Sequence, residues 1–187
     1  MESWPRKHRI TVDEYYRMAE VGLLAPDARV ELIEGEIIEM APIGTDHGSV
    51  VDVLTLLMIK AVDDRAQVRT QGAIRLNRRS EPQPDLALLT PRADKYRRAQ
   101  PSPADILLVV EVSDSTLRYD RDVKIPLYAR HDIPEVWIFD LPNREFRTFR
   151  SPEAGSYLDQ DVTSDPGVIR PQALPDVSVD LSGILAD

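Results

Sequence analysis

The feature that most constrains the fold is an apolar run interrupted by a single carboxylate. Residues 106–112 read Ile-Leu-Leu-Val-Val-Glu-Val, a pattern typical of a central strand that is covered on both faces of a sheet. A carboxylate inside such a strand is costly unless it is paired or binds a metal. Glu111 therefore indicates a functional site, a structural ion pair, or a strand that emerges into solvent one residue early.

A second acidic residue begins the preceding apolar segment. Residues 85–89 read Asp-Leu-Ala-Leu-Leu, and residues 90–105 between the two segments read as a loop. If the two strands pair antiparallel, the start of one lies beside the end of the other, and Asp85 meets Glu111 at one edge of the sheet. We expect these two carboxylates to lie within a few ångströms of one another, about the span that one Mg²⁺ ion can bridge.

A lysine in the next segment is the third candidate. Residues from about 119 to 131 are expected to be helical, so Asp120 and Lys124, four apart, share a face. The start of this segment follows Glu111 closely, where a lysine could orient a hydrolytic water and offset charge on a phosphate. The alternative is an ordinary surface pair between Asp120 and Lys124. Because Pro126 lacks a backbone donor, the helix should bend or restart near Lys124.

Patterns elsewhere predict the remaining helices and strands. Thr11-Val-Asp-Glu14 matches a capping box and opens a helix through about residue 20. The spacing of Val51, Leu54 and Met58 predicts a long helix from about 46 to 64. Further strands are expected at 29–33 and 36–40 around a Glu34-Gly35 turn, at 67–71, 73–76, 136–141 and 145–150, and the tail should add a strand or two.

Length and composition favour an ordinary folded domain. The 187 residues, 42% of them hydrophobic, suit one domain with a core at about 10–150 and C-terminal strands and a tail at 151–187. No apolar run approaches the roughly 20 residues that cross a bilayer, and residues 1–9 are too polar for a secretory signal. We therefore expect a cytoplasmic protein without membrane contact. The absence of cysteine excludes thiolate metal sites and a cysteine nucleophile.

Net charge weighs against a nucleic-acid partner. Lysine and arginine number 23 and acidic residues 32, a formal charge of −9, whereas proteins that bind nucleic acid usually carry a basic face. Metal-binding carboxylates, however, count as negative only until the metal arrives. If the chain binds DNA, a basic strip should border the acidic site, drawn from Arg78, Arg79, Lys95, Arg97, Arg98 and Arg121. The alternative for these short clusters is solvated loop charge.

Several short motifs occur in a specific order. They are Pro84-Asp85, Glu111-Val-Ser-Asp-Ser-Thr116, Tyr119-Asp120, Lys124-Ile-Pro-Leu-Tyr128 and Ile133-Pro-Glu-Val-Trp137. In order and spacing they resemble the bacterial Uma-type endonucleases of the PD-(D/E)XK, or restriction-endonuclease-like, superfamily, from about residue 10 to 181. The resemblance implies an α/β (α+β) fold, with a mixed central sheet flanked by helices and preceded by an N-terminal helix and β-hairpin.

The resemblance also implies a set of site residues. A divalent metal, Mg²⁺ or Mn²⁺, would be held by Asp85, Glu111 and the backbone carbonyl of Val112. Glu31 matches the N-terminal acidic position of the family better than the neighbouring turn residue Glu34, and would be an outer metal or water ligand. His47 matches a histidine at the start of the long helix, where a hydrogen-bonded, half-buried histidine is the alternative.

One departure from the superfamily pattern bears on activity. The usual lysine lies two residues after the glutamate, where this chain has Ser113. The Uma-type pattern replaces it with a lysine from the following helix, which matches Lys124, on the same face as Asp120. Ser113 could contact phosphate or cap the helix, and Tyr128 and Trp137 are expected to be core aromatics.

Two functions are therefore open. The first is Mg²⁺-dependent hydrolysis of DNA phosphodiester bonds, with Asp85, Glu111, Lys124 and Glu31 as catalytic residues. A homodimer is expected in that case, because cutting two strands needs two sites. The second is a catalytically inactive module on the nuclease fold that binds nucleic acid or protein, since fold alone does not settle function.

Overall fold

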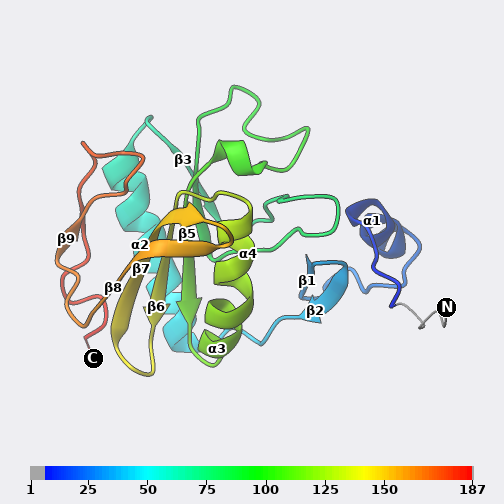
Figure 1. Cartoon of the computed structure of the whole chain (residues 1–187), viewed down its shortest axis with the longest axis horizontal. Helices are drawn as coiled ribbons and strands as arrows, with labels where there is room; N and C mark the ends of the chain where they lie inside the picture. Colours follow the sequence, from blue (N-terminus) through cyan, green and yellow to red (C-terminus); the bar gives the residue numbers. More distant parts are fainter. Residues whose placement is uncertain (1–6, 187) are drawn as a thin grey trace.

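A six-stranded mixed sheet organises the computed structural model, which describes residues 7–186 (Figure 1). Its strands lie in sequence order, and β5 and β6 run parallel while every other neighbouring pair is antiparallel. The strands are β3 (Gln67–Thr70), β4 (Leu86–Leu89), β5 (Ile106–Ser113), β6 (Glu135–Asp140), β7 (Glu145–Glu153) and β8 (Ser156–Thr163). The predicted mixed sheet flanked by helices is confirmed.

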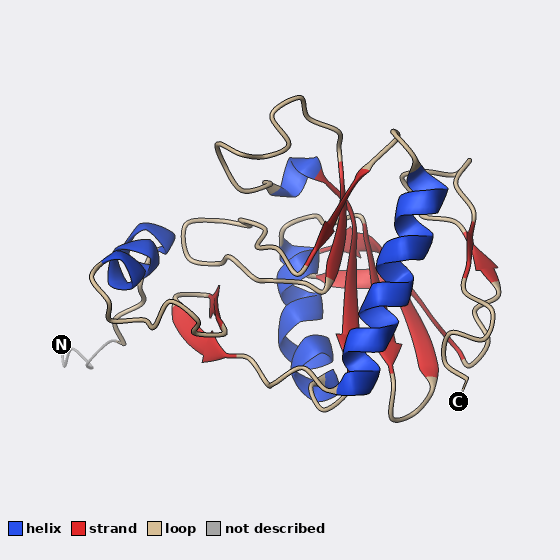
Figure 2. Cartoon of the chain, turned by 180° about the vertical axis from the view of Figure 1, so that it is seen from behind, coloured by secondary structure: helices blue, strands red, loops and turns tan. Residues whose placement is uncertain are grey.

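Helices cover the two faces of this sheet, as Figures 1 and 2 show from opposite sides. On one face, α2 (Thr45–Val62) packs its buried side chains against Leu108, Val110 and other sheet residues. On the other face, α4 (Ile125–Arg130) packs against Val109 and its neighbours. Because side chains alternate along a strand, Glu111 of β5 shares the face of Val109 and points toward the helical segment that precedes α4.

That segment carries a local distortion. It begins with the short helix α3 (Leu117–Tyr119), continues as a π-helical turn, η2 (Asp120–Lys124), and restarts as α4, with Pro126 in its first turn. Within η2 the N–H of Ile125 donates to the carbonyl of Asp120, five residues back. Pro126 has no N–H to offer, so the helix widens by one residue before restarting. The distortion predicted near Lys124 is confirmed.

The N-terminal elements project from one side of the sheet (Figure 1). Helix α1 (Val12–Glu20) begins with the predicted capping box, and β1 (Val30–Ile33) pairs antiparallel with β2 (Glu36–Glu39). The turn between these strands needs glycine at Gly35, where φ is +79° and an added Cβ would lie 2.8 Å from the Cβ of Arg9. The predicted N-terminal helix and hairpin are confirmed.

Two predictions about strands are wrong. Residues 73–76 form no strand, because the N–H groups of Ile74 and Leu76 donate to Pro82 and Ser80 within a loop that folds back on itself. The tail adds three strands instead of one or two: β8, which completes the central sheet, and the small pair β9 (Val168–Ile169) and β10 (Val179–Asp180). As an edge strand, β8 is mostly exposed, so its polar composition resembles that of a loop.

Within residues 7–186 no helix has the length and apolar character needed to cross a membrane.

Candidate active site

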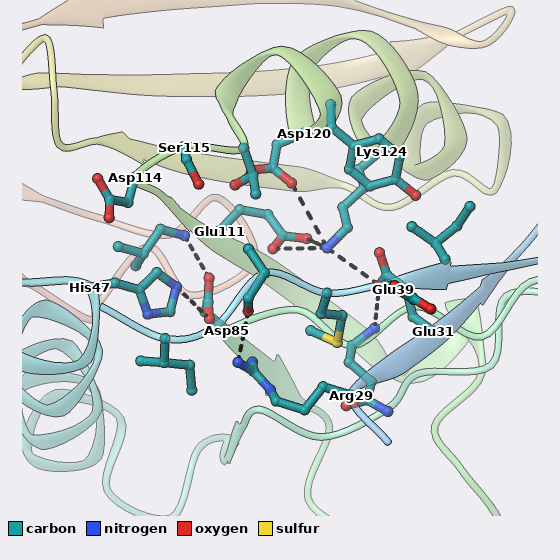
Figure 3. Close-up of a pocket in the computed structure, with 18 of the residues that line it drawn as sticks. Arg29, Glu31, Glu39, His47, Asp85, Glu111, Asp114, Ser115, Asp120 and Lys124 are labelled. Carbon is teal, nitrogen blue, oxygen red and sulfur yellow. Dashed lines mark hydrogen bonds and ion pairs between the residues drawn. The ribbon is translucent and has the colours of Figure 1, made fainter. Parts of the chain in front are cut away.

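A pocket of about 760 Å³ opens where β4 begins and β5 ends (Figure 3). Its walls come from the β1–β2 hairpin, the start of α2, the strand ends, and the α3–η2 segment. Of the eight residues proposed from the sequence, seven line it: Glu31, His47, Asp85, Glu111, Val112, Asp120 and Lys124. Residues far apart in the chain thus meet in one pocket.

The register between β4 and β5 brings Asp85 to Glu111. The predicted antiparallel pairing is confirmed, with Leu86 opposite Val110, and one further step of the same register sets Asp85 across from Glu111 on the same face. Asp85 Oδ2 accepts a 2.8 Å hydrogen bond from the N–H of Val112, which fixes it at the strand end. The separation of the two carboxylates stays a prediction.

Lys124 is buried among carboxylates and does not form a surface pair. Its Nζ lies 3.3 Å from Glu111 Oε1, 3.4 Å from Glu31 Oε2 and 3.9 Å from Asp120 Oδ1, and only 5% of the residue is exposed. Burial alone would lower the pKa of Lys124, but Glu111, Glu31 and the other nearby acids outweigh it and raise that pKa. Lys124 is therefore a charged ammonium, and the surface-pair alternative is wrong.

Glu111 is as deeply buried as the apolar strand around it. It is 3% exposed, so the strand does not emerge into solvent early. Its Oε1 accepts a 2.6 Å hydrogen bond from the hydroxyl of Tyr128. Burial raises the pKa of Glu111 well above its ordinary value; Lys124 opposes this, and the charges of Asp120 and Asp85 add to it. One lysine thus faces several acids, a charge excess that a divalent cation would relieve.

Ser113 has a different role from those proposed. It is fully buried and is absent from the pocket lining. Its hydroxyl donates a 2.8 Å hydrogen bond to Asp120 Oδ2, and the hydroxyl of Thr116 donates to the same oxygen at 2.6 Å. Ser113 therefore neither contacts the pocket space nor caps the helix; it holds the carboxylate of Asp120, whose other oxygen faces Lys124.

His47 supports Asp85 from the start of α2. Its Nε2 lies 3.1 Å from Asp85 Oδ1. The hydrogen bond with Asp85 raises the pKa of His47, burial opposes this, and the charge of Asp114 reinforces the rise. The expected position of this histidine at the head of the long helix is confirmed, and its partner is one of the two acids proposed to bind metal.

Two buried polar atoms beside the pocket have no hydrogen-bond partner within residues 7–186. They are His47 Nδ1 and the hydroxyl of Tyr119, and both residues line the pocket. Because buried polar atoms are nearly always satisfied, these two mark places where water or ligand atoms fit. Sequence reasoning missed Tyr119, although it stands next to Asp120 in one of the motifs quoted above.

The donor set suits a hard divalent cation that keeps much of its water. Among the described residues, no group of three or more histidine, cysteine or acidic side chains is arranged to surround a metal. Asp85 and Glu111, however, supply two carboxylates beside Val112, and Mg²⁺ typically uses one or two carboxylates with water and substrate oxygens. Together with the excess of acid over lysine, these residues fit such an ion.

The predicted basic strip does not line the pocket. None of Arg78, Arg79, Lys95, Arg97, Arg98 and Arg121 is among its lining residues. Arg29 and Arg118 line it instead; Arg29 donates to the carbonyl of Ala41 at 2.8 Å, and the side chain of Arg118 is 93% exposed. Whether the predicted strip borders the pocket outside its lining stays a prediction, because clustering along the chain does not report clustering in space.

Comparisons with known proteins agree on fold and family. The model of the Uma2 family, described as "Putative restriction endonuclease", matches residues 12–182. The chain also superimposes on the crystal structure of "a putative nuclease belonging to DUF820" from Anabaena variabilis, with a TM-score of 0.73 and 16% identity over 95% of this chain and 98% of that one. At that identity the likeness shows the fold. None of the curated proteins compared with the chain matches it.

Proposed function

Because the chain belongs to the Uma2 family, we propose that it is a metal-dependent endonuclease that hydrolyses the phosphodiester bonds of DNA. The observation that carries this proposal is the pocket in which one buried lysine faces Glu31, Glu111 and Asp120, and which Asp85 also lines. A purely structural ion pair would need one acid. An excess of carboxylates at an open pocket is the arrangement expected where a cation binds.

Each residue has a defined task in this proposal. Asp85, Glu111 and the carbonyl of Val112 would hold Mg²⁺ or Mn²⁺, which when bound polarises a phosphate oxygen and lowers the pKa of water. Lys124 would donate hydrogen bonds to the attacking water or to a phosphate oxygen and offset its charge. Glu31 would keep the ammonium charged and act as an outer water ligand.

Positioning residues support these groups. The Tyr128 hydroxyl holds Glu111, His47 holds Asp85, and Ser113 holds Asp120. The hydroxyl of Tyr119, which has no hydrogen-bond partner among the described residues, would donate to a ligand in the pocket. Such supports matter because a catalytic constellation is effective only when its side chains are fixed before the substrate arrives.

The test is cleavage of supercoiled plasmid and of single-stranded DNA by the purified protein, with Mg²⁺, with Mn²⁺ and with a chelator. We expect cleavage only with metal, and a loss of about a hundredfold or more in rate for Asp85→Asn and for Glu31→Gln. Glu34→Gln is the matched control, because Glu34 lies on the same hairpin but pairs with Arg130 away from the pocket. Equal cleavage by Asp85→Asn and wild type would overturn the proposed metal site.

A second function is favoured by one observation. The Lys124 ammonium lies within 3.4 Å of both Glu111 and Glu31, so it already neutralises part of the acid that a metal would need. The alternative is a non-catalytic module that binds nucleic acid or protein. Melting curves separate the two, because a ligand that binds the folded state raises the melting temperature. A rise with Mg²⁺ in wild type but not in Asp85→Asn supports the nuclease, and no rise supports the module.

A further inference from the structure

The outer face of α2 is apolar although no element within residues 7–186 covers it. The helix buries Val51, Leu54, Met58 and Val62 against the sheet. Its opposite face exposes three more large apolar side chains, Val53 at 45%, Leu56 at 53% and Ile59 at 53%. Figure 2 shows this helix in front of the sheet with nothing over its outer side. Helices that are apolar on both faces are normally buried on both.

Charged residues frame this apolar stripe on the same exposed face. Asp52 lies four residues before Leu56 and Lys60 lies four residues after it, and both are exposed. Val53 and Ile59 likewise lie three residues before and three after Leu56. The apolar residues are therefore placed symmetrically about Leu56. The two charged residues are equally distant from Leu56 and opposite in sign.

We propose that this α2 face docks against the same face of a second copy of the chain, with the two helices antiparallel and a two-fold axis passing beside Leu56. In a two-fold interface the same patch must complement itself. Antiparallel pairing about Leu56 brings Asp52 level with Lys60 of the partner subunit, and Val53 level with Ile59 of the partner subunit. Apolar side chains then meet apolar ones, and each acid meets a base.

The size of the patch sets the strength of the contact. One helix face buries less than the roughly 800 Å² per partner of a standard stable interface. We therefore expect a dimer whose population depends on protein concentration. Two antiparallel copies also place the pockets at opposite ends of the helix pair, because His47 lies nine residues before Leu56. At about 1.5 Å per residue, the two His47 positions are then about 27 Å apart along the helix axis.

The first experiment measures oligomeric state. Sedimentation equilibrium of the full chain over a wide concentration range should show a monomer–dimer equilibrium. Leu56→Glu should shift it to monomer, because it places two like charges at the two-fold axis. Leu158→Glu is the control: Leu158 is 68% exposed on β8, away from α2, and this variant should dimerise like wild type. Far-UV circular dichroism confirms that both variants fold. A wild type that is monomeric throughout overturns the proposal.

The second experiment tests the antiparallel register. Asp52→Lys alone and Lys60→Asp alone each put like charges at the same level of the interface, so each should weaken the dimer. The double variant restores opposite charges and should recover dimerisation. Association through apolar contact alone, with no fixed register between the helices, would not show this recovery. If the double variant is as monomeric as the single ones, the proposed register is wrong.

A third experiment uses the lack of cysteine in the chain. In Leu56→Cys the single thiol of each copy can form a disulfide only with another copy, and the two-fold axis brings these thiols together. Mild oxidation should give a covalent dimer in Leu56→Cys much faster than in Leu158→Cys. Equal rates would contradict the two-fold contact. None of these measurements depends on whether the chain cleaves DNA, so the interface and the proposed activity can fail separately.

Discussion

Replacing Lys124 with methionine removes a buried ammonium while keeping most of its volume. The Nζ of Lys124 lies 3.3 Å from Glu111 and 3.4 Å from Glu31. At an effective dielectric constant of about 20, each unit-charge pair at this distance attracts by about 5 kcal/mol. Burying the ions costs several kcal/mol each, so little net stabilisation is left in the wild type. In the variant the attraction disappears while the acids stay buried.

We therefore expect Lys124→Met to lower the free energy of unfolding by about 3 to 5 kcal/mol, the range for removing one partner of a buried ion pair. Urea unfolding followed by far-UV circular dichroism measures this directly. Lys7→Met is the matched control, because Lys7 forms a 3.7 Å pair with Glu36 but its side chain is 81% exposed. Removing that surface pair should cost no more than about 1 kcal/mol.

A second variant tests the cause of the loss. Lys124→Met combined with Glu111→Gln removes one of the acids left without a partner. The double variant should lose less stability than the sum of the two single variants, since residues in contact are energetically coupled. If Lys124→Met costs no more than Lys7→Met, or if the two losses near Lys124 simply add, then Lys124 does not balance buried acids and the reasoning is refuted.

Three further predictions concern the supports of the site and a distant control. Tyr128→Phe removes the hydroxyl that donates to Glu111 and should cost about 1.5 to 3 kcal/mol in urea unfolding; an unchanged midpoint would contradict the bond. Ser113→Ala removes one of two hydroxyl donors to Asp120 and should cost about 1 to 3 kcal/mol. We expect it also to slow plasmid cleavage, and a wild-type rate would show that this hydroxyl has no influence on the site. Thr11→Ala removes the capping box of α1 and should cost about 1 kcal/mol of stability. It should not change the cleavage rate at a temperature where the variant is folded. Loss of cleavage at that temperature would mean that α1 does more than support the fold.

The convergence of Asp85 and Glu111 on one pocket could be predicted from the sequence, because it follows from strand pairing alone. The connection at residues 90–105 reads as a loop with no helical pattern, which is compatible with antiparallel neighbours, and antiparallel neighbours place the start of one strand beside the end of the other. The position of Glu31 could not be derived in this way. No spacing rule connects it with Lys124, so only the family resemblance indicated that it belongs to the site.

The hydrogen-bond partners of the polar side chains in the site could not be predicted from the apolar periodicity of the sequence. Apolar periodicity reports which face of an element is buried, and it correctly placed Tyr128 in the core. It does not report which buried group a hydroxyl meets, so the bond from Tyr128 to Glu111 was missed. The same limit applies to Ser113, whose partner Asp120 lies on a different element. The strand predicted at residues 73–76 was wrong for a related reason. Ile74 and Leu76 are buried, as they would be in a strand, but their backbone N–H groups donate to carbonyls within a loop.

The N-terminal elements bear on how the pocket opens. Helix α1 and the β1–β2 hairpin lie beside the sheet and not on it (Figure 1), and the hairpin is tied to the rest of the chain by the bridge between Leu32 and Glu81. The hairpin pairs with no strand of the central sheet, so it can open without breaking the hydrogen bonds of that sheet, at the cost of exposing the buried side chains of Leu32 and Ile33. Opening would carry Glu31 away from Lys124 while β5 stayed paired. Amide hydrogen exchange rates in β1 would then measure opening and closing of the pocket, and the rates in β5 would measure whether the central sheet stays intact.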